Sequence, residues 1–186
     1  MELYGDSIMA GNGSPETPAM TLQRLRPGLQ LVADHSAPDT TLAMLYADFA
    51  SQPRSARFVV IENGVIDAWR GAPRDRLIDT YSVMVEQPRA EGRVPVLTGY
   101  ARQLPGGSIQ GGELARRDPY DAALHAFADE SGIAFADWGA VPFEGQADLL
   151  DTVHPNKRYS DRLVSRLAGT LDVLAPECVV DAGSAG

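Results

Sequence analysis

Short apolar segments alternate along this chain with longer segments of helical periodicity. Five apolar segments have the length of β-strands: Glu2–Gly5, Leu29–Ala33, Phe58–Glu62, Val94–Gly99 and Ile133–Asp137. Between them, leucines and aromatic residues recur at intervals of three and four residues, which is the spacing of one helix face. This alternation is typical of βαβ units, in which helices connect parallel strands and cover their sheet. The sequence therefore predicts an α/β protein with a parallel sheet of five strands.

The length of 186 residues and an apolar fraction of 44% are sufficient for one domain with a substantial core. We expect a single domain over residues 1–177, followed by a C-terminal tail over residues 178–186. The helical stripes are interpreted as core-facing rather than as ligand sites. Asp118 before Pro119 predicts the N-cap and the first turn of one of the helices.

The formal net charge of −9 argues against nucleic acid or an anionic membrane as a partner, because both would be repelled. No apolar run reaches the roughly 20 residues that a membrane-spanning helix needs, so we expect no membrane insertion. No signal-peptide pattern precedes the first strand, and the sequence leaves the compartment unknown, with a cytoplasmic location as the default. The single cysteine, Cys178, has no partner for an internal disulfide, and the composition does not specify an oligomeric state.

Three residues that can act together chemically lie near the two ends of the chain. Ser7 directly follows the first expected strand, and Asp151 and His154 precede the last expected helix. A serine hydroxyl becomes nucleophilic when a base removes its proton, and histidine, with an ordinary pKa of about 6.5, suits that role. The imidazole in turn needs an acceptor on its other nitrogen. We therefore predict that Ser7 is a nucleophile, that His154 is its general base and later an acid, and that Asp151 orients the imidazole.

Each motif alone has a simpler interpretation, with Ser7 as a turn serine and His154 as a surface residue that caps a helix. Their order within one α/β domain favours the catalytic interpretation. His35 and His125 show no zinc-site spacing, and no glycine-rich run ends in a lysine, so we expect no metal and no cofactor. The glycine-rich segment Leu104–Gly112 is interpreted as a flexible surface loop, with the rim of an acyl site as the alternative.

The segments Tyr4–Gly11 (YGDSIMAG) and Asp151–Asn156 (DTVHPN) resemble two sequence blocks of the SGNH, or GDSL-type, esterase/lipase family. Because these blocks lie near opposite ends, the resemblance spans essentially the whole chain. It implies a three-layer α/β/α sandwich with a five-stranded parallel sheet in the flavodoxin-like order 2-1-3-4-5. Ligands of such sheets bind beyond the carboxyl ends of the strands. The resemblance also assigns the roles given above to Ser7, Asp151 and His154, and it implies no cofactor.

The chain departs from this family at two positions of the oxyanion hole. In the family, a glycine of the second block and an asparagine of the third block join the N–H of the serine. Pro38 stands at the glycine position and has no N–H, and Ile66 stands at the asparagine position and has no polar group. The loss of one such donor typically costs about 10²–10³ in turnover. We therefore expect a non-standard oxyanion hole.

The nearest amide to the missing asparagine belongs to Asn63, at the end of the third expected strand. We predict a hole formed by the N–H of Ser7 and the side chain of Asn63. A strand-end turn before Gly64 is the simpler interpretation of Asn63. The backbone N–H groups of Asp39 and Gly64 are alternative donors.

Together these features predict a serine ester hydrolase, an acyl or acetyl esterase that acts on a small-molecule ester through an acyl-enzyme. Two alternatives share the fold. One is a non-catalytic binding module in which the hole has decayed, and the other is an acyltransferase to a carbohydrate hydroxyl.

Overall fold

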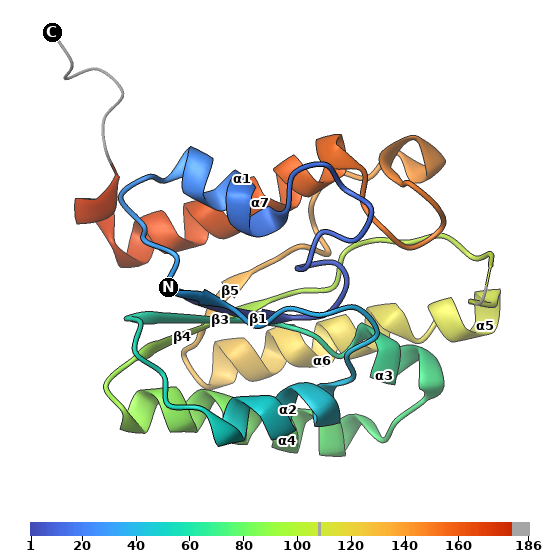
Figure 1. Cartoon of the computed structure of the whole chain (residues 1–186). Coiled ribbons are helices and arrows are strands. Elements are labelled where there is room, and N and C mark those ends of the chain that lie inside the picture. The colour runs from blue at the N-terminus through green and yellow to red at the C-terminus, as the bar shows by residue number, and fades with distance from the viewer. Residues whose placement is uncertain (108, 180–186) are drawn as a thin grey trace, which may run out of the picture.

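In a computed structural model of the protein, which describes residues 1–107 and 109–179, five parallel strands form one sheet (Figure 1). Their order is β2-β1-β3-β4-β5, which confirms the predicted fold class and strand order. The strands are β1 (Glu2–Gly5), β2 (Ala33–Asp34), β3 (Phe58–Glu62), β4 (Val94–Thr98) and β5 (Ala134–Ala136).

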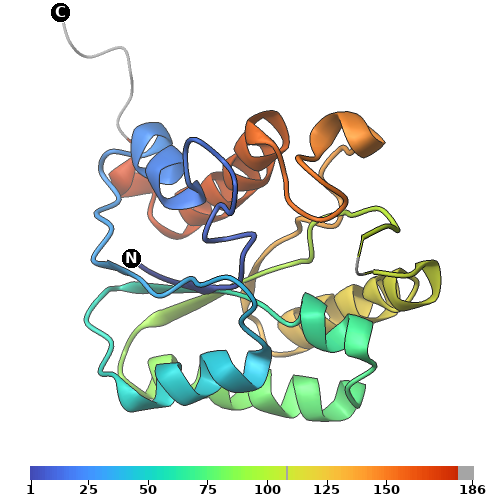
Figure 2. The same ribbon diagram turned by 45° about the vertical axis from the view of Figure 1, so that its right-hand side comes forward.

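Helices cover both faces of the sheet and complete a three-layer sandwich (Figures 1 and 2). One layer contains α1 (Pro18–Leu25) and α7 (Lys157–Leu174). The opposite layer contains α2 (Leu42–Ser51), α3 (Val65–Arg70), α4 (Arg74–Ala90) and α6 (Arg117–Glu130). Short elements complete the chain: α5 (Gly111–Leu114) and the 3₁₀ turns η1 (Gly145–Asp148) and η2 (Pro176–Cys178). No helix in the described part of the chain has both the length and the apolarity to span a membrane.

The sheet separates two hydrophobic cores. Val60 in β3 and Val96 in β4 pack into the core beneath α1 and α7. The next residue of each strand, Ile61 and Leu97, packs into the core against α2, α4 and α6. Successive strand residues point to opposite faces, so a sheet covered on both sides needs continuous apolar strands. This is why these strands are visible in the sequence as uninterrupted apolar runs.

The second strand lies further along the chain than its apolar run predicts. Strand β2 covers Ala33–Asp34 rather than Leu29–Ala33, with Ala33 opposite Glu2 of β1. Leu29 instead closes a turn by donating its N–H to the carbonyl of Arg26, and its side chain is buried in the core. The apolar character of Leu29 therefore reflects core packing before the strand.

The N-terminus of α6 also differs from the expectation. The helix begins at Arg117, so Asp118 and Pro119 both lie within its first turn and Asp118 is not the N-cap. The cause is Arg117, which is buried because its guanidinium donates to the carbonyls of Tyr100 and Ala101. Most of the predicted C-terminal tail, residues 180–186, lies outside the described residues, and the predicted domain boundaries stay a prediction.

We predict that Gly64→Ala destabilises the fold strongly. Gly64 has a φ of +97°, and a Cβ there would lie 2.6 Å from the buried hydroxyl of Tyr100 and 3.1 Å from that of Tyr81. Left-handed backbone strain and overpacking together should cost about 2–5 kcal/mol in the free energy of unfolding. Gly92→Ala is the matched control, because Gly92 has a φ of +72° with no atom near its Cβ position. Denaturant titration of both variants measures the difference, and equal losses would contradict the packing argument.

Candidate active site

The structure brings together the three residues predicted from the two ends of the chain. Ser7 follows the carboxyl end of β1, and Asp151 and His154 lie in the loop before α7. The Nε2 atom of His154 is 3.1 Å from Ser7 Oγ, and its Nδ1 atom is 2.7 Å from Asp151 Oδ2. These distances are within hydrogen-bonding range. The three side chains therefore form one continuous polar chain.

The Asp151 carboxylate is held by the loop that carries it. Its Oδ1 atom accepts from the backbone N–H groups of Val153 and His154, at 2.7 and 2.8 Å. Partial burial alone would raise the pKa of Asp151. The hydrogen bonds from the His154 ring and from these two N–H groups outweigh that effect, so the pKa lies below its usual value. Asp151 is thus an anion at neutral pH, as an orienting carboxylate must be.

A neighbouring amide indicates which nitrogen of His154 carries the proton. Asn12 Nδ2 lies 3.3 Å from His154 Nε2. An amide nitrogen donates only, so with this amide orientation Nε2 is an acceptor and the proton resides on Nδ1, facing Asp151. In that tautomer the one lone pair of Nε2 faces both Asn12 and the closer Ser7 hydroxyl, from which it can take a proton.

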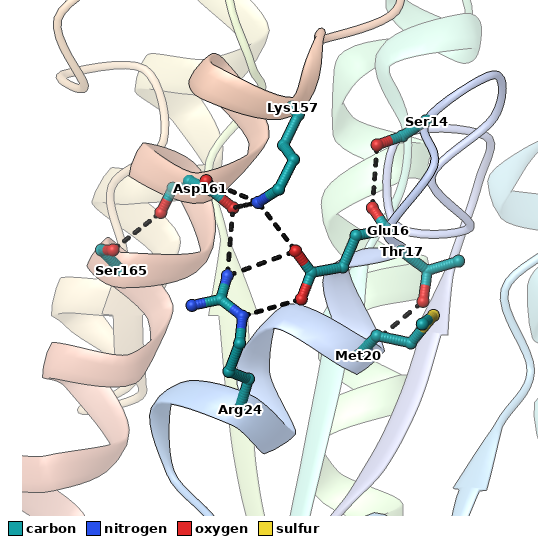
Figure 3. Close-up of polar contacts among 8 residues, drawn as sticks. All are labelled: Ser14, Glu16, Thr17, Met20, Arg24, Lys157, Asp161 and Ser165. Atoms are coloured by element: carbon teal, nitrogen blue, oxygen red, sulfur yellow. Dashed lines mark hydrogen bonds and ion pairs between the residues drawn. The ribbon is translucent and has the colours of Figure 1, made fainter.

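A charge network ties the start of α7 to the segment after Ser7 (Figure 3). The Glu16 carboxylate contacts Arg24 of α1 at 2.8 Å and Lys157 of α7 at 2.7 Å. Lys157 also contacts Asp161 at 2.8 Å. Hydrogen bonds from Arg24 and Lys157 lower the pKa of Glu16 to about 2. Because Lys157 lies three residues after His154, the network holds the histidine loop against the half of the chain that bears Ser7.

Two buried carboxyl groups lie beneath the nucleophile. Asp6 and Glu62 are each 1% exposed, and the backbone N–H of Asp6 donates to Glu62 Oε2 at 3.2 Å. Asp6 Oδ1 accepts from the N–H of Ile8 at 2.8 Å, which shapes the turn around Ser7. Burial raises the pKa of Asp6 to about 6. Burial, and secondly the nearby Asp6 charge, raise the pKa of Glu62 well above its usual value.

Ser7 and His154 open onto a cavity of about 100 Å³. The apolar part of its lining comes from four separate parts of the chain: Ile8, Val65, Ile66, Trp69, Ile109 and Val153. Asp6, Asp39 and Gln103 complete the lining.

The loop that the sequence analysis interpreted as a plain surface loop contributes to this cavity. Ile109 is 4% exposed and lines the pocket beside Ser7. The N–H of Leu104 donates to the carbonyl of Thr152 at 2.9 Å, and the Thr152 hydroxyl donates to the carbonyl of Gly106 at 3.2 Å. These contacts favour the alternative interpretation of the segment, a rim of the site packed against the histidine loop.

The structure places Asn63 behind the pocket and not in its lining. Asn63 is 1% exposed, its Nδ2 donates to the carbonyl of Thr40 at 3.0 Å, and its Oδ1 accepts from the N–H of Gly64 at 2.7 Å. The second bond also engages the alternative donor Gly64. The assignment of Asn63 to the hole stays a prediction, and it requires the amide to turn away from Thr40.

Two backbone donors remain beside the nucleophile. Within the described residues, neither Ser7 nor Asp39 donates its backbone N–H to a protein acceptor. Asp39 lines the pocket, and its φ of +59° makes it the one non-glycine residue with positive φ in the described part of the chain. Such left-handed strain is frequent where backbone groups are directed at a functional site.

Sequence reasoning missed three polar residues of the site. A signal existed for Glu62, because an acidic residue that ends an apolar strand is unusual. Asn12 and Gln103 lie in irregular segments and carry no local signal. Among the residues that the structure describes, no three or more His, Cys, Asp or Glu side chains gather as a potential metal site.

Comparison with known proteins identifies a family and a shared fold. The sequence profile of the GDSL-like Lipase/Acylhydrolase family matches residues 3–162. No curated protein matches the chain.

Several solved structures share the fold. TesA is 25% identical over 93% of this chain and 98% of its own, with a TM-score of 0.72. The psychrotrophic esterase EstA from Pseudoalteromonas sp., solved with monoethylphosphonate as inhibitor, is 16% identical over 94% and 97%, with a TM-score of 0.75. A catalytic mutant of an acetylxylan esterase from Geobacillus stearothermophilus is 19% identical over 91% and 92%, with a TM-score of 0.69.

The buried carboxyl pair predicts an unusual pH dependence of stability. Because the pKa values of Asp6 and Glu62 are raised in the folded state, that state binds more protons than the unfolded chain, and the pair destabilises the fold as pH rises through about 6. The free energy of unfolding of Glu62→Gln, taken relative to the parent, should therefore be higher at pH 8 than at pH 5. The expected difference is on the order of 1–3 kcal/mol. Denaturant unfolding at both pH values measures this.

Glu86→Gln on the exposed side of α4 is the matched control, since its carboxylate makes only a surface contact with Arg89. Equal pH dependence of the Glu62 variant and the parent would contradict the raised pKa values.

Proposed function

The chain belongs to the GDSL-like lipase/acylhydrolase family, and from this premise we propose that it is a serine ester hydrolase with Ser7 as nucleophile. His154 is its general base and then its general acid, and Asp151 orients the imidazole. The observation that carries the proposal is the hydrogen-bond chain from Asp151 through His154 to Ser7. Coincidental residues from opposite ends of a chain have no reason to align in this way.

In the acylation step, Ser7 Oγ forms a bond to the ester carbonyl carbon while its proton passes to His154 Nε2. The π-electron pair of the carbonyl moves to its oxygen. Collapse of this tetrahedral intermediate breaks the bond to the alcohol oxygen, which takes the proton from Nε2. A water molecule then attacks the acyl-enzyme with His154 again as base, and Ser7 regains its proton as the acid is released. Asp151 stabilises the imidazolium in both steps.

The negative oxygen of each intermediate needs hydrogen-bond donors. The backbone N–H groups of Ser7 and Asp39 are unengaged within the described chain and belong to residues that line the pocket. They are our candidates for two donors of the hole. Asp39 directly follows Pro38, so this backbone donor lies one residue further along the chain than the donor of the family.

The pocket favours a small acyl group. Its volume of about 100 Å³ and the apolar side chains in its lining suit an acetyl or similarly short chain. One structural neighbour is an acetylxylan esterase, which is in keeping with a short acyl group. The net charge of −9 further favours neutral over anionic esters.

We expect Ser7→Ala to lower kcat for p-nitrophenyl acetate by at least about 10³-fold, because the nucleophile is lost. A fluorophosphonate probe should label the parent at Ser7 and leave the variant unlabelled. Ser14→Ala is the control, since the Ser14 hydroxyl donates to the carbonyl of Glu16 and does not line the pocket. Equal hydrolysis by the parent and Ser7→Ala would reject the assignment. A folded parent that neither reacts with the probe nor hydrolyses the ester would favour a binding module.

The size of the acyl pocket gives a second test. We expect kcat/KM to be at least about tenfold lower for p-nitrophenyl octanoate than for the acetate, because added methylenes have no room beside Ile66 and Trp69. Steady-state kinetics over the acetate, butyrate and octanoate esters measures the trend. A rise in kcat/KM with chain length would contradict the assignment of this cavity to the acyl group.

A further inference from the structure

A buried amide without a partner lies against the pocket of Ser7. Gln103 is 6% exposed, and neither Nε2 nor Oε1 of its side chain has a hydrogen-bond partner among the described residues. Burial of an unpaired amide is unfavourable, because the group loses its water without a replacement. A side chain that is kept in this state beside a reactive serine indicates that a ligand supplies the missing partner.

Gln103 lines both of the hollows that an ester bound at Ser7 could occupy. Gln103 lines the small cavity together with Ser7, Ile66 and His154. It also lines a neighbouring hollow of about 420 Å³, which includes Phe143. An ester with its acyl group in the small cavity and its alcohol toward the larger hollow would thus carry its carbonyl past this amide.

We propose that Gln103 is the side-chain donor of the oxyanion hole and supplies, from the loop after β4, the amide N–H that Ile66 does not provide. This inference rests on the proposed function, since it assigns a donor to the intermediate formed at Ser7. The new donor comes from a different loop than the family position, which follows β3.

The backbone on both sides of Gln103 is held in place, which fixes the point from which its side chain extends. The N–H of Arg102 donates to the hydroxyl of Tyr159 at 2.8 Å, and the Arg102 Nε donates to the carbonyl of Gly139 at 3.0 Å. On the other side, the N–H of Leu104 donates to the carbonyl of Thr152, two residues before His154. The loop that presents Gln103 is therefore tied directly to the loop that presents the base. Donors fixed before the reaction stabilise developing charge most effectively.

The other polar side chains near Ser7 fit the role less well. The Asn63 amide already donates to the carbonyl of Thr40 and lies outside the pocket lining. The indole Nε1 of Trp69 lacks a described partner and lines the pocket, but Trp69 is only partly buried and belongs to the apolar wall. Gln103 combines deep burial, an unpaired donor and fixed flanks.

An amide N–H would act on the transition state more than on the bound ester. As Ser7 Oγ bonds to the carbonyl carbon, negative charge gathers on the carbonyl oxygen and the hydrogen bond from Gln103 Nε2 strengthens. No proton leaves the amide. The loss of this donor should therefore lower kcat and leave KM nearly unchanged.

Gln103→Met tests this, because methionine has a similar volume and no amide. We expect kcat for p-nitrophenyl acetate to fall by about 10²-fold, KM to change less than about threefold, and the melting temperature to stay the same or rise. A structural role for Gln103 would instead lower the melting temperature. Gln87→Met in α4 is the matched control, since the buried Gln87 Oε1 is also unpaired among described residues but lies outside the pocket.

Two outcomes overturn the inference while the proposed function stands. One is an unchanged kcat in Gln103→Met, whether or not KM rises and whether or not Trp69→Phe shows a loss. The other is a loss of kcat that comes with a lowered melting temperature. If the methionine variant fails to fold, Gln103→Leu also removes the amide without adding a charge and should show the same loss of kcat. Absence of both hydrolysis and Ser7 labelling in the parent would instead reject the proposed function, and this inference with it.

Discussion

Strand β1 lies at the point where the strand order of the sheet reverses, and the rest of the structure depends on this position. β1 pairs with β2 on one side and with β3 on the other, so the chain leaves it toward opposite edges. Such a switch point opens a crevice at the carboxyl ends of the strands. Ser7 follows β1 into this crevice, and α7 packs against α1 so that the loop before it returns to the same place. The contact between Ser7 and His154, 147 positions apart, follows from this topology.

The electrostatics of the site are layered. The outer layer holds ionised groups: Asp151, kept anionic by hydrogen bonds, and the charge network of Glu16, Arg24 and Lys157. The inner layer holds Asp6 and Glu62, whose burial favours their protonated forms. Burial of these carboxyls works against stability at neutral pH and shapes the turn that presents Ser7. The burial of Asp6 and Glu62 destabilises the fold, and the two hydrophobic cores on either side of the sheet offset this loss.

The departures at Pro38 and Ile66 change where donors must come from without changing the framework. The fold and the polar chain of Ser7, His154 and Asp151 are retained around them. The strained backbone at Asp39 and the unpaired amide of Gln103 both lie on the wall of the pocket where those donors are lost. Under the proposed function, these two neighbouring groups are the candidates to replace the lost donors.

The sequence by itself determined the fold class, four of the five strands to within about one residue, and the three residues that meet in the site. It could do so because strand and helix periodicity and the motifs around Ser7 and His154 are local patterns. Only the tertiary structure decided that Leu29 packs before β2 and that the amide of Asn63 faces Thr40. It also decided that Gln103 is buried with no hydrogen-bond partner among the residues that the structure describes. Each of these depends on which side chains from distant segments fill the same space, and no local pattern encodes that competition.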